Sequence, residues 1–505
     1  MQYLYYAGIA VPVLLVGAAA FLSMRKIPGA EVSAPGVPEY SPEEADRAAQ
    51  ALAEAIRCRT VSYTDVTRRD FTQWVALRRV LRDRFPLSHE RMVSEQAAGF
   101  SSLYKWESPE PSGDPILLCG HLDVVPAEGV WRVPPFEGRI EDGFVWGRGA
   151  LDCKNIVVCL FMALESLFER GFVPGRDVYL ALGHDEELGG AEGAKQLARY
   201  FAQRGIRFSL VLDEGGFITD GAFPVGKPVA DICAAEKGIM DVRLSASAPG
   251  GHSSRPPERT AVGLLCEAVC RIGFRQRPAR LLPLVRDNLE TIAPWLDAPL
   301  RRYIASPRLY RKKMLARLCA DERTAALVRT TAAPTVINGG VAPNVLPVSA
   351  ELNLNIRLLP GDDAEGLVAW IGALTRDLGV KVEVVQEETA SGISDYKSAA
   401  FSALAGAVND VFPGVPAVPG LFCGATDARH YAPFSNAVLR FSPFILTSDE
   451  LATMHAENER VAVASLGAAV RFYRRVVERF CAPAADAAQL AGDNAPGAPK
   501  EEEAL

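Results

Sequence analysis

The sequence predicts an α/β protein with a mostly parallel central sheet, interrupted by an inserted α+β domain. From about residue 41 to 235, short apolar runs alternate with longer segments of helical spacing, the pattern of a parallel sheet covered on both faces. Past residue 236, apolar residues occupy alternate positions over 242–246 and 352–356, which is typical of half-exposed strands. The α/β pattern then returns from about residue 361.

The first α/β part contains three expected strands and two expected helices. The strands are the apolar runs 116–119, 178–182 and 209–212, and the helices are 155–170 and 191–204. Because strand, loop and helix repeat in this order, we expect parallel strands whose carboxyl ends meet at one edge of the sheet.

These patterns divide the chain into parts. We expect a main domain formed by 45–236 and 359–481, with an inserted domain over 237–358. Residues 27–44 are expected to form a linker, and the tail 482–505, rich in Ala, Pro and Gly, is expected to be disordered. Basic residues between 301 and 313 favour a solvated helix face over a binding patch.

The composition is that of a globular protein. Of the 505 residues 49% are hydrophobic and 23% charged, which excludes a disordered chain, a collagen and a multi-span transporter. With 61 acidic against 54 basic residues, the chain has no basic footprint for nucleic acid, so we expect no nucleic-acid partner. The ten cysteines form no close CxxC pair, which favours buried free thiols over a disulfide framework.

The N-terminal segment 1–26 is apolar. Residues 3–24 carry no charge, and about 20 apolar residues suffice for a helix to cross a bilayer. We therefore expect a single membrane span that anchors the protein, although Arg25 and Lys26 do not determine on which side. The alternative is a cleaved signal peptide, since small residues lie at 18–20, and the protein would then be secreted.

Residues that can ligate a metal ion follow each of the three expected strands. In open α/β sheets, ligands bind at the carboxyl ends of the strands. A single His-x-Asp would more simply be a structural hydrogen-bonded pair, but several His, Asp and Glu residues together suit paired zinc-like ions. Without a cation, such carboxylates would repel one another. The residues are His121 and Asp123, then Glu186 and Glu187, then Asp213, with Asp152 and His455 in separate loops.

From about residue 45 to 478 the chain resembles the aminoacylase/carboxypeptidase family of dinuclear zinc hydrolases. Its motifs occur in the order seen in that family: GHLDVVP, WRVPPFEG, GRGALDCKN, HDEELGG, LDEGG, GGHSSRP, NGGVAPNVLP, the Arg of NIRLLPG, GATDARHY and MHAENE. The hydrophobic N-terminus and the long insert resemble the Gly-Xaa carboxypeptidase and N-fatty-acyl-amino-acid hydrolase subfamily. The resemblance implies that the main domain is a zinc-peptidase catalytic domain and that the insert is a lid or dimerisation domain.

The resemblance also implies two zinc ions per subunit, for which cobalt or manganese could substitute. His121 and Asp213 match the ligands of one zinc, Glu187 and His455 those of the other, and Asp152 matches the bridging carboxylate. Two further roles are implied nearby: Glu186 as the general base, and Asp123 as the residue that orients the His121 imidazole.

Other matched residues are implied to act on the substrate. His252, in the insert, matches a residue that donates to the oxyanion, often in the active site of a partner subunit, which suggests a homodimer. Asn344 and Arg357 match positions that hold the substrate carboxylate, and the loop beginning at Gly424 is expected to shape the substrate end of the cleft. Cys153 stands where many relatives have an acidic residue, so it is either an extra ligand or, more simply, a buried structural thiol.

We therefore expect a metal-dependent hydrolase that cleaves the amide bond of a small-molecule substrate. That substrate would be a dipeptide or an N-acyl amino acid with a free carboxylate. A water shared by two metal ions loses its proton near neutral pH, and Glu186 is expected to take that proton. Two alternatives stay open: a biosynthetic deacylase of the acetylornithine deacetylase or desuccinylase type, and a non-catalytic binding protein on the same scaffold.

Overall fold

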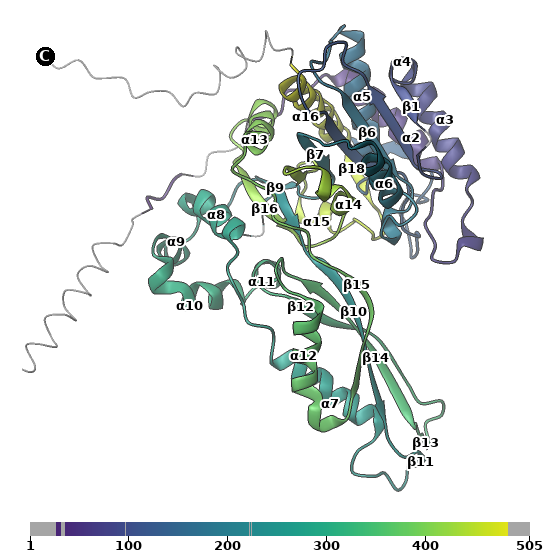
Figure 1. Cartoon of the computed structure of the whole chain (residues 1–505), viewed down its shortest axis with the longest axis vertical. Helices are drawn as coiled ribbons and strands as arrows, with labels where there is room; N and C mark the ends of the chain where they lie inside the picture. The colour runs from purple at the N-terminus through teal and green to yellow at the C-terminus, as the bar shows by residue number, and fades with distance from the viewer. Residues whose placement is uncertain (1–26, 32–35, 96, 222, 224, 483–505) are drawn as a thin grey trace, which may run out of the picture. The chain divides into compact units, whose positions relative to one another are not determined.

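The computed structural model describes residues 27–31, 36–95, 97–221, 223 and 225–482, and it divides into two compact units (Figure 1). The smaller unit consists mainly of Glu236–Ser391. The larger unit consists mainly of the chain on both sides of this segment, together with Lys227–Ala235. The predicted disordered tail lies, from residue 483 on, outside the described residues.

The prediction of a membrane anchor is contradicted. It rested on residues 3–24 forming an apolar helix of about 20 residues, and these residues lie outside the described part of the chain. Among the helices that the structure describes, none has the length and apolar character needed to cross a membrane.

Nine strands of the larger unit form its central sheet, in the order β1-β2-β6-β3-β7-β17-β9-β16, with β8 paired to β9. Strand β3 pairs in parallel with both β6 and β7, and β7 pairs in parallel with β17. The predicted α/β fold with a mainly parallel central sheet is thus confirmed. The strands are β1 (Val93–Glu95), β2 (Ser102–Trp106), β3 (Ile116–His121), β6 (Val178–Gly183), β7 (Leu210–Asp213), β8 (Ile218–Thr219), β9 (Val229–Glu236), β16 (Ala417–Phe422) and β17 (Val438–Arg440).

Helices cover both faces of this sheet. Side chains alternate along a strand, so Ile116 and Leu118 of β3 enter one core while Leu117 and Cys119 enter another. The first core is shared with α2 (Pro42–Arg57), α5 (Lys154–Glu169) and α16 (Val463–Cys481), and the second with α6 (Ala194–Arg204) and α14 (Ala428–Tyr431). Every residue of β3 is buried as a result.

Helix α5 is apolar on nearly every side, as a helix within a core must be. Its one buried carboxylate, Glu165, accepts hydrogen bonds from the backbone N–H groups of Leu87 and Ser88 and from the Ser88 hydroxyl. Other elements of this unit are α3 (Thr72–Arg84), α4 (Pro86–Arg91), β4 (Arg139–Glu141), β5 (Phe144–Trp146), α13 (Ala399–Val411), α15 (Ser448–Leu451) and β18 (Arg460–Ala462).

The smaller unit has an antiparallel sheet of four strands in the order β12-β14-β10-β15. The predicted alternating segments lie in β10 and β14, where Val242 is paired with Leu354. Apolar residues of the sheet pack against α7 and α12, which lie side by side (Figure 1). The elements are β10 (Gly238–Ser247), α7 (Ala261–Phe274), β12 (Thr331–Gly339), β14 (Ser349–Leu358), α12 (Ala364–Thr375) and β15 (Lys381–Glu388).

This unit extends past residue 358, where the sequence analysis ended the insert. Strand β10 has two edges, and β15 pairs with the edge that β14 leaves free, so the segment up to Ser391 belongs here. The unit also contains β11 (Gly251–His252), β13 (Val345–Leu346), α8 (Pro283–Ile292), α9 (Ala298–Ala305), α10 (Pro307–Leu318) and α11 (Glu322–Val328).

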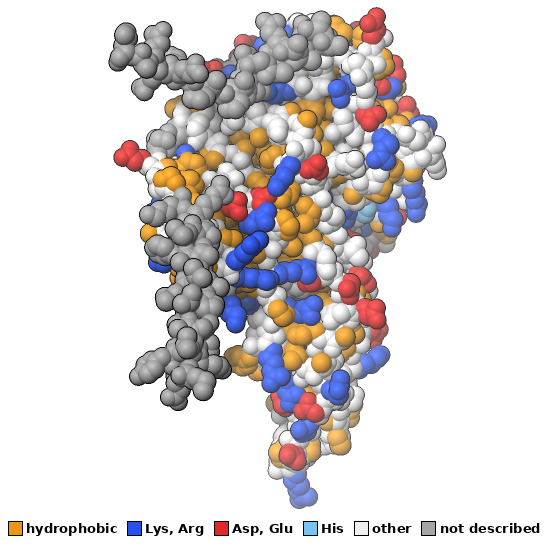
Figure 2. Space-filling view, turned by 60° about the vertical axis from the view of Figure 1, so that its left-hand side comes forward, with side chains coloured by type: hydrophobic (Ala, Val, Ile, Leu, Met, Phe, Trp, Pro, Cys, Tyr) orange, Lys and Arg blue, Asp and Glu red, His pale blue; other side chains and the backbone are white. Residues whose placement is uncertain are grey.

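Most basic residues of α9 and α10 face solvent, while Arg301 is half-buried. Arg302, Arg311, Lys312 and Lys313 are all exposed. Figure 2 shows Lys and Arg side chains on one face of the molecule, set among hydrophobic and uncharged ones.

Candidate metal centre

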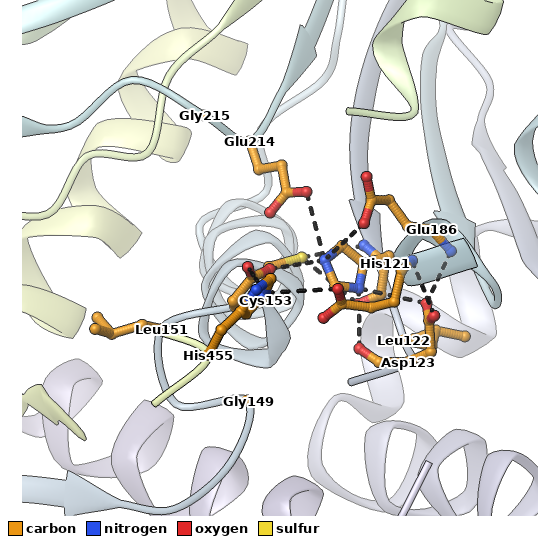
Figure 3. A network of polar contacts seen from close by, with 12 residues as sticks. His121, Leu122, Asp123, Gly149, Leu151, Cys153, Glu186, Glu214, Gly215 and His455 are labelled. Carbon is orange, nitrogen blue, oxygen red and sulfur yellow. Dashed lines mark hydrogen bonds and ion pairs between the residues drawn. The ribbon is translucent and has the colours of Figure 1, made fainter. Parts of the chain in front are cut away.

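The predicted ligands converge because the parallel strands end at the same edge of the sheet. His121 is the last residue of β3 and lies opposite Gly183, the last residue of β6. The chain after β6 then forms a short 3₁₀ turn, Glu186–Leu188, which places Glu186 beside His121 (Figure 3). Strand β7, on the other side of β3, ends at Asp213.

A first cluster consists of His121, Asp152, Cys153 and Glu214, whose potential ligand atoms all lie within 4.8 Å of one another. The Nε2 atom of His121 lies 2.9 Å from Oδ1 of Asp152 and 3.4 Å from Oε1 of Glu214. Figure 3 shows the Glu214 carboxylate pointing toward the His121 ring.

A second cluster consists of Asp152, Glu187 and His455. The Nε2 atom of His455 lies 2.8 Å from Oδ2 of Asp152 and 3.5 Å from Oε2 of Glu187. Asp152 therefore belongs to both clusters and turns a different oxygen toward each histidine, an arrangement in which one carboxylate would serve two metal ions.

Asp123 fixes the orientation of His121. The Nδ1 atom of His121 lies 2.9 Å from the backbone oxygen of Asp123, which can only accept, so Nδ1 carries the proton and Nε2 is left for a metal ion. The Asp123 carboxylate accepts from the Ser62 hydroxyl at 2.6 Å and from the backbone N–H groups of Glu186 and Glu187 at 3.1 and 3.2 Å. One buried side chain thus connects the His121 strand end to the loop that carries both glutamates.

Glu186 lies beside the clusters without belonging to either. Its Oε2 atom is 4.0 Å from Nε2 of His121 (Figure 3). Burial raises the pKa of Glu186 well above its ordinary value, and the carboxylates of Glu214 and Asp427 act in the same direction. A carboxyl group tuned in this way beside a metal site is suited to exchanging protons.

The structure places Glu214, rather than Asp213, in the first cluster. Asp213 accepts a hydrogen bond from the Glu214 backbone N–H at 2.9 Å and interacts with the backbone of Ala428 at the start of α14. Burial raises its pKa to about 6. The turn after β7, which contains Gly215 with φ of 105°, decides which of the two adjacent carboxylates reaches His121. Sequence reasoning missed Glu214 because the pair Asp-Glu alone does not reveal that turn.

Cys153 also lies within the first cluster. Its sulfur is 3.2 Å from the backbone N–H of His121, and the thiol is buried. Burial raises the pKa of this thiol well above its ordinary value, an effect that the nearby Glu214 carboxylate reinforces. The structure thus places the sulfur close enough to serve as a ligand while giving it a backbone partner of its own.

The residues of the two clusters fit a pair of divalent cations. Imidazole nitrogen and carboxylate oxygen are the donor atoms that zinc-like ions take in proteins. Glu187 Oε1 is buried and has no hydrogen-bond partner among the described residues. The hydrogen bonds of Asp152 and Glu187 raise the pKa of His455 to about 10, which reflects a local excess of negative charge that bound cations would neutralise.

The remaining predicted site residues fall into two groups. His252, Asn344 and Arg357 belong to the smaller unit, where the Ser253 N–H next to His252 donates to the backbone oxygen of Asn344 at 3.1 Å and Arg357 lies on β14. Gly424 belongs to the larger unit and follows β16. A Cβ atom there would lie 2.7 Å from the Phe422 ring, so a larger residue would require this ring to shift.

The side chain of Asp427, three residues after Gly424, leaves room only for glycine at two positions that flank the Glu186 loop. A Cβ atom at Gly183 or Gly190 would collide with the Asp427 carboxylate. The side chain of Asp427 is 4% exposed and thus packs against both ends of the loop that carries Glu186 and Glu187.

Sequence comparisons relate this chain to known hydrolases. The model of peptidase family M20/M25/M40 matches residues 117–479. An N-fatty-acyl-amino acid synthase/hydrolase of Xenopus tropicalis is 32% identical over 451 residues, which cover 88% of this chain and 87% of that protein. Carboxypeptidase S of Saccharomyces cerevisiae is 31% identical over 442 residues, which cover 77% of this chain and 75% of that protein.

Solved structures share the fold. An M20 family metallo-carboxypeptidase from Sulfolobus solfataricus has a TM-score of 0.62 at 18% identity, covering 86% of this chain and 98% of its own. A Bacillus subtilis protein described as a dinuclear metal binding peptidase of the M20 family has a TM-score of 0.52 at 11% identity, with coverages of 86% and 98%.

Proposed function

Because the chain belongs to peptidase family M20/M25/M40, we propose that its two ligand clusters together hold two zinc ions that serve amide hydrolysis. The predicted resemblance is confirmed by the family match and by relatives with about a third of their residues identical. So is the enzyme class: the chain is a metal-dependent hydrolase that cleaves the amide bond of small peptides or acyl amino acids.

The ligands that we propose follow from the position of Asp152. One ion would be held by His121, Asp152 and Glu214, and the other by Asp152, Glu187 and His455. The observation that carries this assignment is that the two oxygens of Asp152 lie 2.9 and 2.8 Å from the two histidines. Glu214 takes the place that the sequence analysis gave to Asp213. Zinc suits the mixed nitrogen and oxygen donors, and cobalt or manganese could replace it.

The residues around the ions divide the chemistry between them. When bound, two zinc ions polarise the amide carbonyl and make a nearby water more acidic. Glu186, which is not a ligand, accepts a proton from the attacking water and returns it to the leaving amine. Asp123 keeps the His121 proton on Nδ1 and, through the N–H groups of Glu186 and Glu187, holds the base near the ligands.

We propose an N-acyl amino acid or a dipeptide with a free carboxylate as the substrate. The support is the names of the relatives, an N-fatty-acyl-amino acid hydrolase and a carboxypeptidase, whose matches cover three quarters or more of both chains. The parts assigned to His252 at the oxyanion, to Asn344 and Arg357 at the carboxylate and to Gly424 at the substrate end stay predictions, as does the homodimer. A biosynthetic deacylase is the alternative within the same chemistry.

The experiment that tests this proposal is mass-spectrometric detection of cleavage products. The purified zinc-loaded chain is offered dipeptides, short N-acyl amino acids and long-chain N-acyl amino acids, with Glu186→Gln as the control. We expect zinc-dependent release of a free amino acid from one of these classes and none from the control. A folded chain with two zinc ions that cleaves no member of the panel would contradict the proposed substrate class.

A further inference from the structure

A further buried carboxylate, which belongs to neither ligand cluster, lies four residues after His455. Glu459 is 0% exposed. Its Oε1 atom accepts hydrogen bonds from three backbone N–H groups of the loop before Cys153: Gly149 at 3.1 Å, Leu151 at 2.7 Å and Asp152 at 3.2 Å. The last of these belongs to the residue shared by the two ligand clusters.

Arg148 closes the arrangement. Its guanidinium is 2% exposed, forms an ion pair with Oε2 of Glu459, and donates to the backbone oxygen of Ala456 at 3.2 Å. The backbone N–H of Gly147 also donates to the backbone oxygen of Glu459 at 2.9 Å. The segment 147–152 is therefore joined to the segment 455–459 at several points along both.

Neither segment belongs to a helix or strand where it carries its ligand. Asp152 follows β5 in a loop that contains Gly149 with φ of 88°, and His455 itself has φ of 59°. No ladder or helix of hydrogen bonds fixes Asp152 or His455, so the contacts of Glu459 and Arg148 are among those that hold the two loops in place. Figure 3 shows Gly149 and Leu151 on the loop leading to Cys153, with His455 beside it.

A carboxylate suits this position better than other side chains. One of its oxygens can accept several N–H groups while the other pairs with a guanidinium, and both interactions strengthen with its negative charge. A glutamine keeps the shape, but it replaces one acceptor by an NH₂ group that would face either the loop N–H groups or Arg148.

We propose that Glu459, held by Arg148, is a positioning residue that sets the place of Asp152 relative to His455 and so determines how tightly the chain binds its metal ions. Glu459 and Arg148 together would maintain the 2.8 Å separation between His455 Nε2 and Asp152 Oδ2. The inference rests on the proposed function in that it takes Asp152 and His455 as metal ligands.

The test measures metal binding alone, by titrating the metal-free chain with zinc in competition with a chromophoric chelator. Outer residues that orient metal ligands contribute about 10- to 100-fold to metal affinity. We expect Glu459→Gln to raise at least one of the two zinc dissociation constants by about that factor. Arg148→Lys keeps the positive charge but loses the two-pronged guanidinium, so we expect it to raise that constant less.

Glu165→Gln is the matched control. Glu165 is also a buried glutamate that accepts two backbone N–H groups and a hydroxyl, but it contacts α4 and no ligand loop. We expect this variant to lose thermal stability as Glu459→Gln does, while binding both zinc ions with unchanged affinity. Equal loss of zinc affinity in the two variants would overturn the inference, because it would reduce Glu459 to a contributor to stability.

Unchanged zinc affinity in a folded Glu459→Gln chain would also overturn it. If that variant does not fold, Glu459→Asp and Arg148→Lys decide the question by the same comparison with Glu165→Gln. The result is independent of the substrate. A chain whose zinc affinity depends on Glu459 but which cleaves no amide contradicts the proposed function alone. A chain that cleaves an amide but whose zinc affinity does not change in Glu459→Gln contradicts this inference alone.

Discussion

The Oδ2 atom of Asp152 lies 2.8 Å from Nε2 of His455, although the two residues are brought together from loops far apart in the sequence. The Oδ1 atom of the same carboxylate lies 2.9 Å from His121. Among the described residues, Asp152 is thus the one that the two clusters share, and its loss is expected to affect both metal positions at once.

Replacing Asp152 by Asn tests this shared role. The amide keeps the size of the side chain but removes the charge that both cations need, so we expect the zinc content to fall below one ion per chain. Metal ions supply several kcal/mol of transition-state stabilisation, so kcat/KM should fall on the order of 10³-fold or more. Metal analysis of the purified variant provides the measurement, and a variant that retains two tightly bound ions would show that Asp152 is not shared.

Replacing Glu186 by Gln is expected to lower activity while leaving the zinc content unchanged. Glu186 lies 4.0 Å from His121 and belongs to neither cluster, so both zinc ions should stay bound. Loss of general acid–base catalysis should lower kcat by about 10²- to 10⁴-fold with little change in KM. Steady-state kinetics beside metal analysis would check this, and loss of an ion in Glu186→Gln would instead make this residue a ligand.

Two neighbouring carboxylates provide a direct comparison. Glu214 Oε1 lies 3.4 Å from His121 Nε2, whereas Asp213 accepts the Glu214 backbone N–H and faces the start of α14. We therefore expect Glu214→Gln to weaken the first zinc site by at least about 10-fold more than Asp213→Asn does. Zinc competition titrations of the two variants decide the matter, and the reverse order would restore Asp213 as the ligand.

This pair of residues shows where sequence reasoning reached its limit. The strands were predictable from short apolar runs, and the rule that ligands gather at strand ends identified His121, Glu186, Glu187 and Asp213, but not its neighbour Glu214. The choice within that pair was not predictable, because it depends on a turn of one or two residues after β7.

Contacts between segments that are far apart in the sequence also could not be predicted from the sequence pattern. The insert was expected to end at residue 358, shortly before the α/β pattern returns, yet β15 comes back to pair with β10. Glu459 belongs to the MHAENE motif, but its contacts with Gly149, Leu151 and Asp152 depend on how two loops fold against each other. The apolar N-terminal stretch led to a membrane anchor that no described helix supports.

Glu44, which lies outside the metal centre, is expected to make the stability of the fold depend on pH. It lies on α2 and accepts hydrogen bonds from Ser166 on α5 at 2.7 Å and from Arg474 on α16 at 2.8 Å, so it joins three helices of the core. Burial alone would raise its pKa, but the bonds from Ser166 and Arg474 outweigh burial and lower the pKa below its ordinary value.

A carboxylate whose pKa is lowered in the folded state stabilises the fold above its unfolded pKa, which is about 4.3 for Glu. That contribution is lost as the pH falls through the lower, folded-state pKa. We therefore expect Glu44→Gln to lower the melting temperature at pH 7, with the difference from wild type shrinking below about pH 4. Thermal unfolding of both metal-free chains between pH 3 and 7 measures this difference. A gap that stays constant over the whole range would mean that Glu44 acts through packing alone and not through its charge.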